Sequence, residues 1–104
     1  MAERREYERK QLKFKVVLSV PEQPYRRITA EAFSLSVGGM GLKLKETING
    51  RGRVAMRIAR PFFQDSIEGT GEIVWQKGAE GSKDVLAGVK FIEMPFTKIK
   101  ALLT

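Results

Sequence analysis

Apolar and polar residues alternate along most of the chain with a period of two, which is the pattern of half-buried β-strands. The first such run covers residues 12–20, and the second runs from about residue 26 to residue 35. Four further runs follow, over residues 40–45, 53–58, 67–76 and 85–91. Short strands at this spacing predict an all-β domain, either a sandwich or a small barrel.

Turn residues interrupt the alternation between the expected strands. Pro21 and Pro24 bracket the first interruption, and Asn49-Gly50 lies in a later one. Proline cannot donate to a strand ladder, and Asn-Gly is a strong turn signal. Closing six antiparallel strands into a barrel leaves no unpaired edge, so we expect a six-stranded antiparallel barrel.

The last ten residues change to a helical pattern. Proline is favoured near a helix start, and the apolar residues that follow Pro95 fall on one face at helical spacing. These residues are Phe96, Ile99, Leu102 and Leu103. We expect a short C-terminal α-helix over residues 95–104, packed against one end of the barrel through Phe96, Ile99 and Leu103.

The run over residues 67–76 differs from the others because it holds two glycines. Gly69 and Gly71 leave space for a bulge or a tight bend of the barrel. Ile73 and Trp75 are two residues apart, so they are expected on the same side of this strand. We interpret Trp75 as core or rim packing rather than as a platform for a ligand.

The balance of charge points to an anionic partner. Within 104 residues, enough for one domain, 19 Lys and Arg stand against 12 Asp and Glu, a net charge of +7. Such an excess favours nucleic acid, a phosphate-bearing small molecule or an anionic membrane, without choosing among them. Basic residues such as Arg53 and Arg57 alternate outward, which is typical of a solvated face. The sequence lacks an aromatic strand face for stacking bases, which weighs against nucleic acid.

Residues that the chain lacks exclude several classes of site. Cys and His are both absent, which removes disulfides, Cys-based metal sites and the usual general base near neutral pH. No nucleophile–base set and no paired carboxylates stand out, so we expect no metal, no cofactor and no enzymatic activity. No apolar run approaches the roughly 18 residues that span a bilayer, and no signal peptide is evident, so a cytoplasmic protein is expected.

Two stretches carry the candidate chemistry. Residues 34–41, Ser-Leu-Ser-Val-Gly-Gly-Met-Gly, place two hydroxyls and three glycines between two apolar runs. Residues 1–11 are almost wholly polar and form an expected flexible basic arm, ahead of a barrel domain over residues 12–104. Within this arm, Arg5 and Arg9 can act together on one anion, because a guanidinium binds phosphate bidentately and stacks on rings.

In these two stretches the chain resembles the PilZ domain, a bacterial family with a six-stranded antiparallel barrel that binds the second messenger cyclic di-GMP. The family signature is Arg-x-x-x-Arg before the first strand and Asp/Asn-x-Ser-x-x-Gly after the second. Residues 5–9 match the first motif, and residues 34–39 match the second at Ser36 and Gly39. The segments over residues 71–75 and 87–91 also resemble the last two strands of the family, so the resemblance covers essentially the whole chain.

The resemblance implies a ligand site that consists of Arg4, Arg5, Arg9, Ser34, Ser36 and Gly39. The arginines would bind phosphate or the O6 and N7 edge of guanine, Ser36 would supply a hydroxyl, and Gly39 would let the backbone come near. In the family, an arginine at the place of Arg4 goes with binding of a stacked pair of ligand molecules. The implied function is a cyclic di-GMP receptor whose arm closes over the ligand and regulates a protein partner.

Ser34 departs from the family pattern. Aspartate or asparagine at this place would accept from the guanine N1 and N2 donors, whereas serine is shorter and offers one oxygen. Losing a good hydrogen bond to a buried donor costs about 1–3 kcal/mol, so affinity would fall ~5- to 100-fold. The alternative is a degenerate PilZ-like interaction module that does not bind nucleotide. Such members usually lack the arginines, which this chain keeps.

Overall fold

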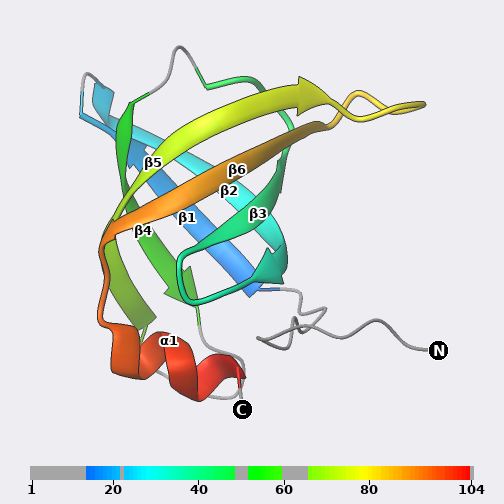
Figure 1. Cartoon of the computed structure of the whole chain (residues 1–104). Helices are drawn as coiled ribbons and strands as arrows, with labels where there is room; N and C mark the ends of the chain where they lie inside the picture. The colour runs from blue at the N-terminus through cyan, green and yellow to red at the C-terminus, as the bar shows by residue number, and fades with distance from the viewer. Residues whose placement is uncertain (1–13, 22, 49–51, 60–65, 104) are drawn as a thin grey trace, which may run out of the picture.

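The computed structural model describes residues 14–21, 23–48, 52–59 and 66–103. Within these residues, the chain forms six strands and one helix: β1 (Phe14–Val20), β2 (Gln23–Leu35), β3 (Gly39–Leu44), β4 (Arg53–Ala59), β5 (Ser66–Gly78), β6 (Val85–Glu93) and α1 (Phe96–Leu103). Neighbouring strands are antiparallel and close a barrel in the order β1-β2-β3-β6-β5-β4 (Figure 1). The predicted fold class, a six-stranded antiparallel barrel with a short C-terminal helix, is confirmed.

The barrel interior is filled by the alternating apolar residues that the sequence pattern singled out. In β4, for example, Val54, Met56 and Ile58 are buried, and the residues between them are exposed. Fully buried side chains come from all six strands and include Leu18, Leu35, Leu42, Leu44, Ile58, Ile67, Ile73 and Ala87. Burying one large aliphatic side chain stabilises the fold by about 1.5–3 kcal/mol, so this interior is the main source of stability.

The helix α1 lies across one end of the barrel, at the bottom of Figure 1. Ile99 is fully buried there, and Leu103 packs partly buried against the core, as expected. The expected packing of Phe96 is wrong, because its side chain is 48% exposed. Met94, just before the helix, is the buried residue of this segment instead.

From Thr70 onward, β5 departs from the simple alternation of buried and exposed residues. The pairing of β5 with β6 shifts register between Thr70 and Gly71, where the glycines predicted a bulge, and again between Ile73 and Trp75. Ile73 is fully buried, whereas Trp75 is 42% exposed. The prediction that these two side chains share a face is therefore wrong, and Trp75 does not pack in the core. The second bulge is the physical reason, because one extra residue turns the following side chains to the other face.

Three segments that are distant in sequence meet at the end of the barrel near α1. The connection from β2 to β3 lies there, and Phe91 of β6 donates its backbone N–H to Gly38 O at 2.9 Å. The first strand begins beside it, since Phe14 pairs with Ala32 of β2. Predictions for residues 1–13, including the boundary between arm and barrel, lie outside the described residues, as does Asn49-Gly50.

Candidate functional site

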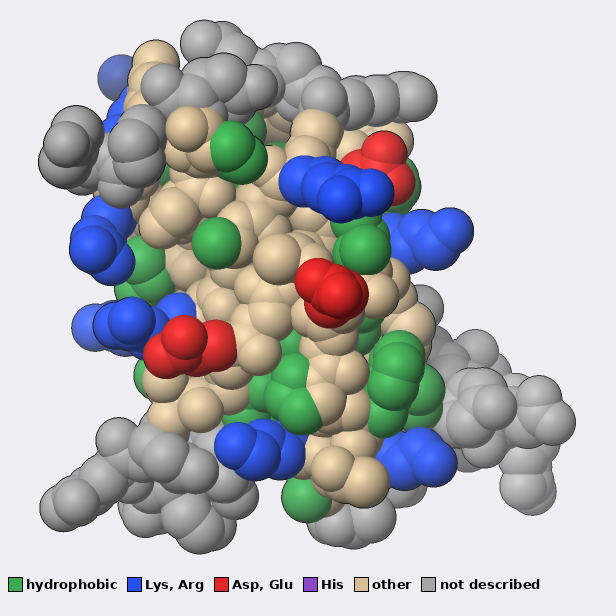
Figure 2. All heavy atoms as spheres, turned by 90° about the vertical axis from the view of Figure 1, so that its left-hand side faces the viewer, with side chains coloured by type: hydrophobic (Ala, Val, Ile, Leu, Met, Phe, Trp, Pro, Cys, Tyr) green, Lys and Arg blue, Asp and Glu red, His purple; other side chains and the backbone are tan. Residues whose placement is uncertain are grey.

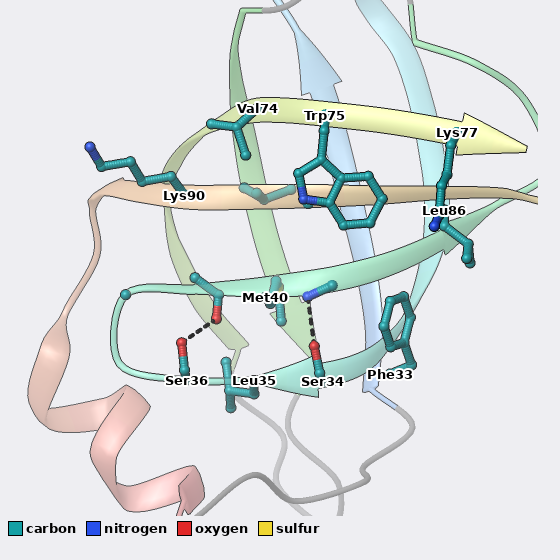
Figure 3. Close-up of a pocket in the computed structure, with 15 residues that line it drawn as sticks. Phe33, Ser34, Leu35, Ser36, Met40, Val74, Trp75, Lys77, Leu86 and Lys90 are labelled. Atoms are coloured by element: carbon teal, nitrogen blue, oxygen red, sulfur yellow. Dashed lines mark hydrogen bonds between the residues drawn. The ribbon is translucent and has the colours of Figure 1, made fainter. Parts of the chain in front are cut away.

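The connection between β2 and β3 is a tight turn whose two serines bond within it. Ser36 donates to Gly39 O twice, from its backbone N at 2.9 Å and from its Oγ at 3.3 Å. Ser34 Oγ accepts from Gly41 N at 3.2 Å (Figure 3). Ser34 thus satisfies a backbone donor where β2 and β3 shift register, between Ala32 and Ser34. Each hydroxyl keeps further hydrogen-bonding capacity for a ligand.

Gly39 is required by close packing between β3 and β6. A Cβ atom built on Gly39 would collide with the carbonyl oxygen of Val89 on β6. A Cβ on the preceding Gly38 would meet nothing within 4 Å. The glycine of the motif is therefore a point where two strand backbones come close together, and the turn depends on it.

A pocket of about 550 Å³ opens on the outer face of the barrel beside this turn. Its lining comes from the end of β2, the turn itself, β3, and the facing parts of β5 and β6. The charged residues of the lining are Lys77 and Lys90, and no carboxylate lines it among the described residues. Its volume is within the range of small-molecule sites, and its charge suits an anion.

Two aromatic side chains line this pocket from opposite sides. Phe33 on β2 is 43% exposed and Trp75 on β5 is 42% exposed. Figure 3 shows the Trp75 indole lying over β6, where a Cβ on Gly88 would collide with it. The expectation that no strand face presents aromatic residues is therefore wrong. The available signal was the pair of glycines at outward strand positions, Gly41 and Gly88, which leave room for rings from neighbouring strands.

A different face of the barrel has a mixed distribution of charge. Figure 2 shows basic and acidic side chains interspersed on the side it presents. The strands β4 and β5 carry one such pair, in which Arg57 Nε lies 3.4 Å from Glu68 Oε2, and both side chains are more than half exposed. Arg53 is exposed as predicted. This face therefore mixes both signs of charge, whereas the charged residues that line the pocket among the described residues are both lysines.

An exposed, hydrogen-bonded ion pair links β3 to the turn of the hairpin whose strands carry Lys77 and Leu86. Lys45, just after β3, donates from Nζ to Asp84 Oδ1 at 2.9 Å. This hydrogen bond lowers the pKa of the Asp84 carboxyl below its ordinary value and raises the pKa of the Lys45 ammonium. The pair joins the turn of the β5–β6 hairpin to the residue just after β3, next to the point where Leu44 pairs with Val85.

The structure brings together the predicted site residues of the β2–β3 connection. Ser34, Ser36 and Gly39 all line the pocket. Arg4, Arg5 and Arg9 lie outside the described residues. Chain connectivity still limits where the arginines can reach. Four residues separate Arg9 from Phe14, the first residue of β1, and an extended chain of this length spans at most about 18 Å. Phe14 pairs with β2 next to the pocket.

Two further classes of site are not seen in the part of the chain that the structure describes. No three acidic, histidine or cysteine residues are grouped there so as to hold a metal ion. In the same residues, no helix has the length and apolar character needed to cross a membrane.

Comparison with known proteins agrees with this geometry. The family model of the PilZ domain matches residues 3–104. The structure of the Bacillus subtilis inhibitor of motility (MotI/DgrA) superposes with a TM-score of 0.74 at 20% sequence identity, covering 98% of this chain and 49% of that chain. The chain thus spans about half the length of that protein, and the likeness is one of fold. No curated protein matches the chain.

Proposed function

The chain belongs to the PilZ domain family, and on this premise we propose that it is a cyclic di-GMP receptor whose N-terminal arm orders over the ligand and regulates a protein partner. PilZ domains are binding and regulatory domains rather than enzymes. One observation carries the proposal: the motif residues Ser34, Ser36 and Gly39 line a pocket that also holds an exposed tryptophan and two lysines.

Each chemical part of a cyclic dinucleotide has a counterpart at this pocket. The two phosphates are anionic and suit Lys77 and Lys90, which line it without a carboxylate among the described residues. A guanine can stack on the exposed indole of Trp75, and stacking of this kind is worth about 1–3 kcal/mol per base. The free lone pairs of Ser34 and Ser36 can accept from the guanine edge.

The arm supplies the remaining contacts in this proposal. Arg5 and Arg9 offer charge-assisted hydrogen bonds to phosphate or to the guanine O6 and N7 edge. They are within reach because β1 begins beside the pocket-lining end of β2. Ordering of residues 1–11 over a bound ligand would create a surface that the free domain does not present, and a partner protein would bind this surface. Arg4 would contact a second ligand molecule where one binds.

Calorimetric titration with cyclic di-GMP tests the proposal directly. We expect saturable binding, together with increased protection of residues 1–11 from amide exchange when the ligand is present. Absence of heat and of chemical-shift changes at millimolar cyclic di-GMP would contradict the receptor function. That result would instead support the alternative function, a protein-interaction module that does not bind nucleotide. The presence of Ser34 in place of the Asp or Asn of the family motif agrees with this alternative.

Restoring the family residue at position 34 should strengthen binding. Ser34→Asn places an amide oxygen nearer to the guanine donors, so we expect cyclic di-GMP affinity to rise about 5-fold or more. The measurement is the dissociation constant by calorimetry, with the melting temperature followed in parallel because Ser34 also bonds Gly41 N. Ser19→Asn, on the outer face of β1 and outside this pocket, is the matched control. Unchanged affinity in a variant that melts like the parent would show that the amide is not the limiting contact.

A further inference from the structure

Four neighbouring strands place their pocket-facing residues in one row. Ser34 on β2 pairs with Gly41 on β3, Gly41 pairs with Gly88 on β6, and Gly88 pairs with Trp75 on β5. The two middle positions of the row carry no side chain. Trp75 forms one end of the row. At the other end, the register shift between Ala32 and Ser34 leaves Phe33 outside the pairing, and its ring lies over Gly41. The row is therefore a shallow trough with a backbone floor and an aromatic residue at each side.

Both rings lean inward over this floor. A Cβ on Gly41 would lie 2.6 Å from Phe33 Cζ, and a Cβ on Gly88 would lie 2.5 Å from Trp75 Cε2. Side-chain positions that pair across two strands are about 4.5–5.5 Å apart, so the inner edges of the two rings are within about 10 Å of each other. Two ring systems are thus within reach of one small ligand that has two bases.

Exposed apolar side chains are concentrated at this trough. Of the four large hydrophobic residues exposed in the described part of the chain, Phe33, Val74 and Trp75 line the pocket, and only Phe96 lies elsewhere. A cluster of exposed apolar groups marks a binding surface more often than scattered ones do. With Lys77 and Lys90 beside it, the trough suits a ligand that combines flat apolar rings with negative charge.

We propose that Phe33 is a second base platform, so that the domain contacts both bases of one dinucleotide and prefers a dinucleotide to a mononucleotide. This inference rests on the proposed function, because it assigns a role within the same pocket. Trp75, whose ring covers Gly88, takes one base on its outer face, and Phe33, whose ring covers Gly41, takes the other. One base can bind at Trp75 without Phe33. Phe33 therefore determines the preference for a dinucleotide over a mononucleotide, and a mononucleotide can still bind without it.

The test compares Phe33→Leu with the matched control Phe96→Leu, which removes a similarly exposed ring outside the pocket. We expect Phe33→Leu to weaken cyclic di-GMP about 5- to 150-fold by calorimetry, to change binding of 5′-GMP less than about 2-fold, and to reduce the preference for the dinucleotide accordingly. Phe96→Leu should leave both affinities unchanged. Because Trp75 is the only tryptophan of the chain, its fluorescence reports stacking on the other platform separately. Its change at saturation should persist in Phe33→Leu.

Equal affinity of Phe33→Leu and the unsubstituted protein for cyclic di-GMP would overturn the inference and leave Phe33 as a cover for Gly41. Equal losses for cyclic di-GMP and 5′-GMP would also overturn it. Should leucine lower the melting temperature, Phe33→Tyr decides the matter because it keeps the ring: affinity like the parent supports a stacking role, and affinity as weak as with leucine overturns it. Failure of the unsubstituted protein to bind cyclic di-GMP would overturn the receptor function itself, which is a distinct result.

Discussion

Replacing Arg5 and Arg9 together with alanine should weaken cyclic di-GMP binding about 100-fold or more. Each arginine is proposed to make a charge-assisted contact worth roughly 1.5–3 kcal/mol, so each single change should cost about 10-fold or more. The melting temperature should not change, because arginines in an almost wholly polar segment supply no apolar side chain to the core. Calorimetry on the two single variants and the double variant measures the effect.

Arg53→Ala and Arg57→Ala are the matched controls, since both residues are exposed on β4, away from the pocket lining. We expect them to leave cyclic di-GMP binding nearly unchanged. If the domain instead bound nucleic acid through its general positive charge, changes at all four arginines would weaken binding comparably, with a steep dependence on salt. Comparable losses for cyclic di-GMP would contradict the assignment of Arg5 and Arg9 to the site.

Adding one methyl group at Gly39 should damage both the fold and the site. In Gly39→Ala the new Cβ collides with the Val89 carbonyl oxygen, and backbone cannot yield as a flexible side chain can. Overpacking of this kind costs about 1–3 kcal/mol, which lowers the melting temperature by roughly 4–8 °C per kcal/mol in a domain of this size. Binding should weaken as well, because the hydrogen bonds of Ser36 to Gly39 O hold the turn. Thermal unfolding and titration measure the two effects.

Gly38→Ala is the control at the neighbouring position. Its Cβ would meet nothing within 4 Å, so the methyl group fits and reduces the freedom of the unfolded chain. We expect the melting temperature of this variant to be unchanged or slightly raised. Equal destabilisation by both changes would show that the turn needs glycine for flexibility rather than for the close approach of β3 to β6.

The sequence was sufficient to predict the barrel, because alternate residues of a half-buried strand face the core and are therefore apolar. The runs in β1, β4 and β6 each present one apolar face, and their inward residues were predicted correctly. The alternation could not locate the register shift between Ile73 and Trp75, because a bulge is set by the pairing with β6. For the same reason it could not show that Trp75 faces outward.

The candidate site was predictable only in its short-range part. Ser34, Ser36 and Gly39 lie within one turn, so a local motif was enough to find them. Predicting that aromatic side chains line the pocket would have required knowing which strands are neighbours in the barrel. Phe33 and Trp75 come to one face only because β3 pairs with β6, and no pattern within a single strand records that pairing.

The pairing of Gly41 with Gly88 joins positions that are almost half a chain apart in sequence. Contacts of this kind are made slowly during folding, because a long loop must close before they stabilise anything. The pocket therefore does not exist in a partly synthesised or partly unfolded chain. Any ligand that occupies it binds the folded state alone and shifts the folding equilibrium of the whole domain toward that state. Abundance of the domain in a cell would then depend on ligand concentration, since unfolded chains are the ones that proteases remove.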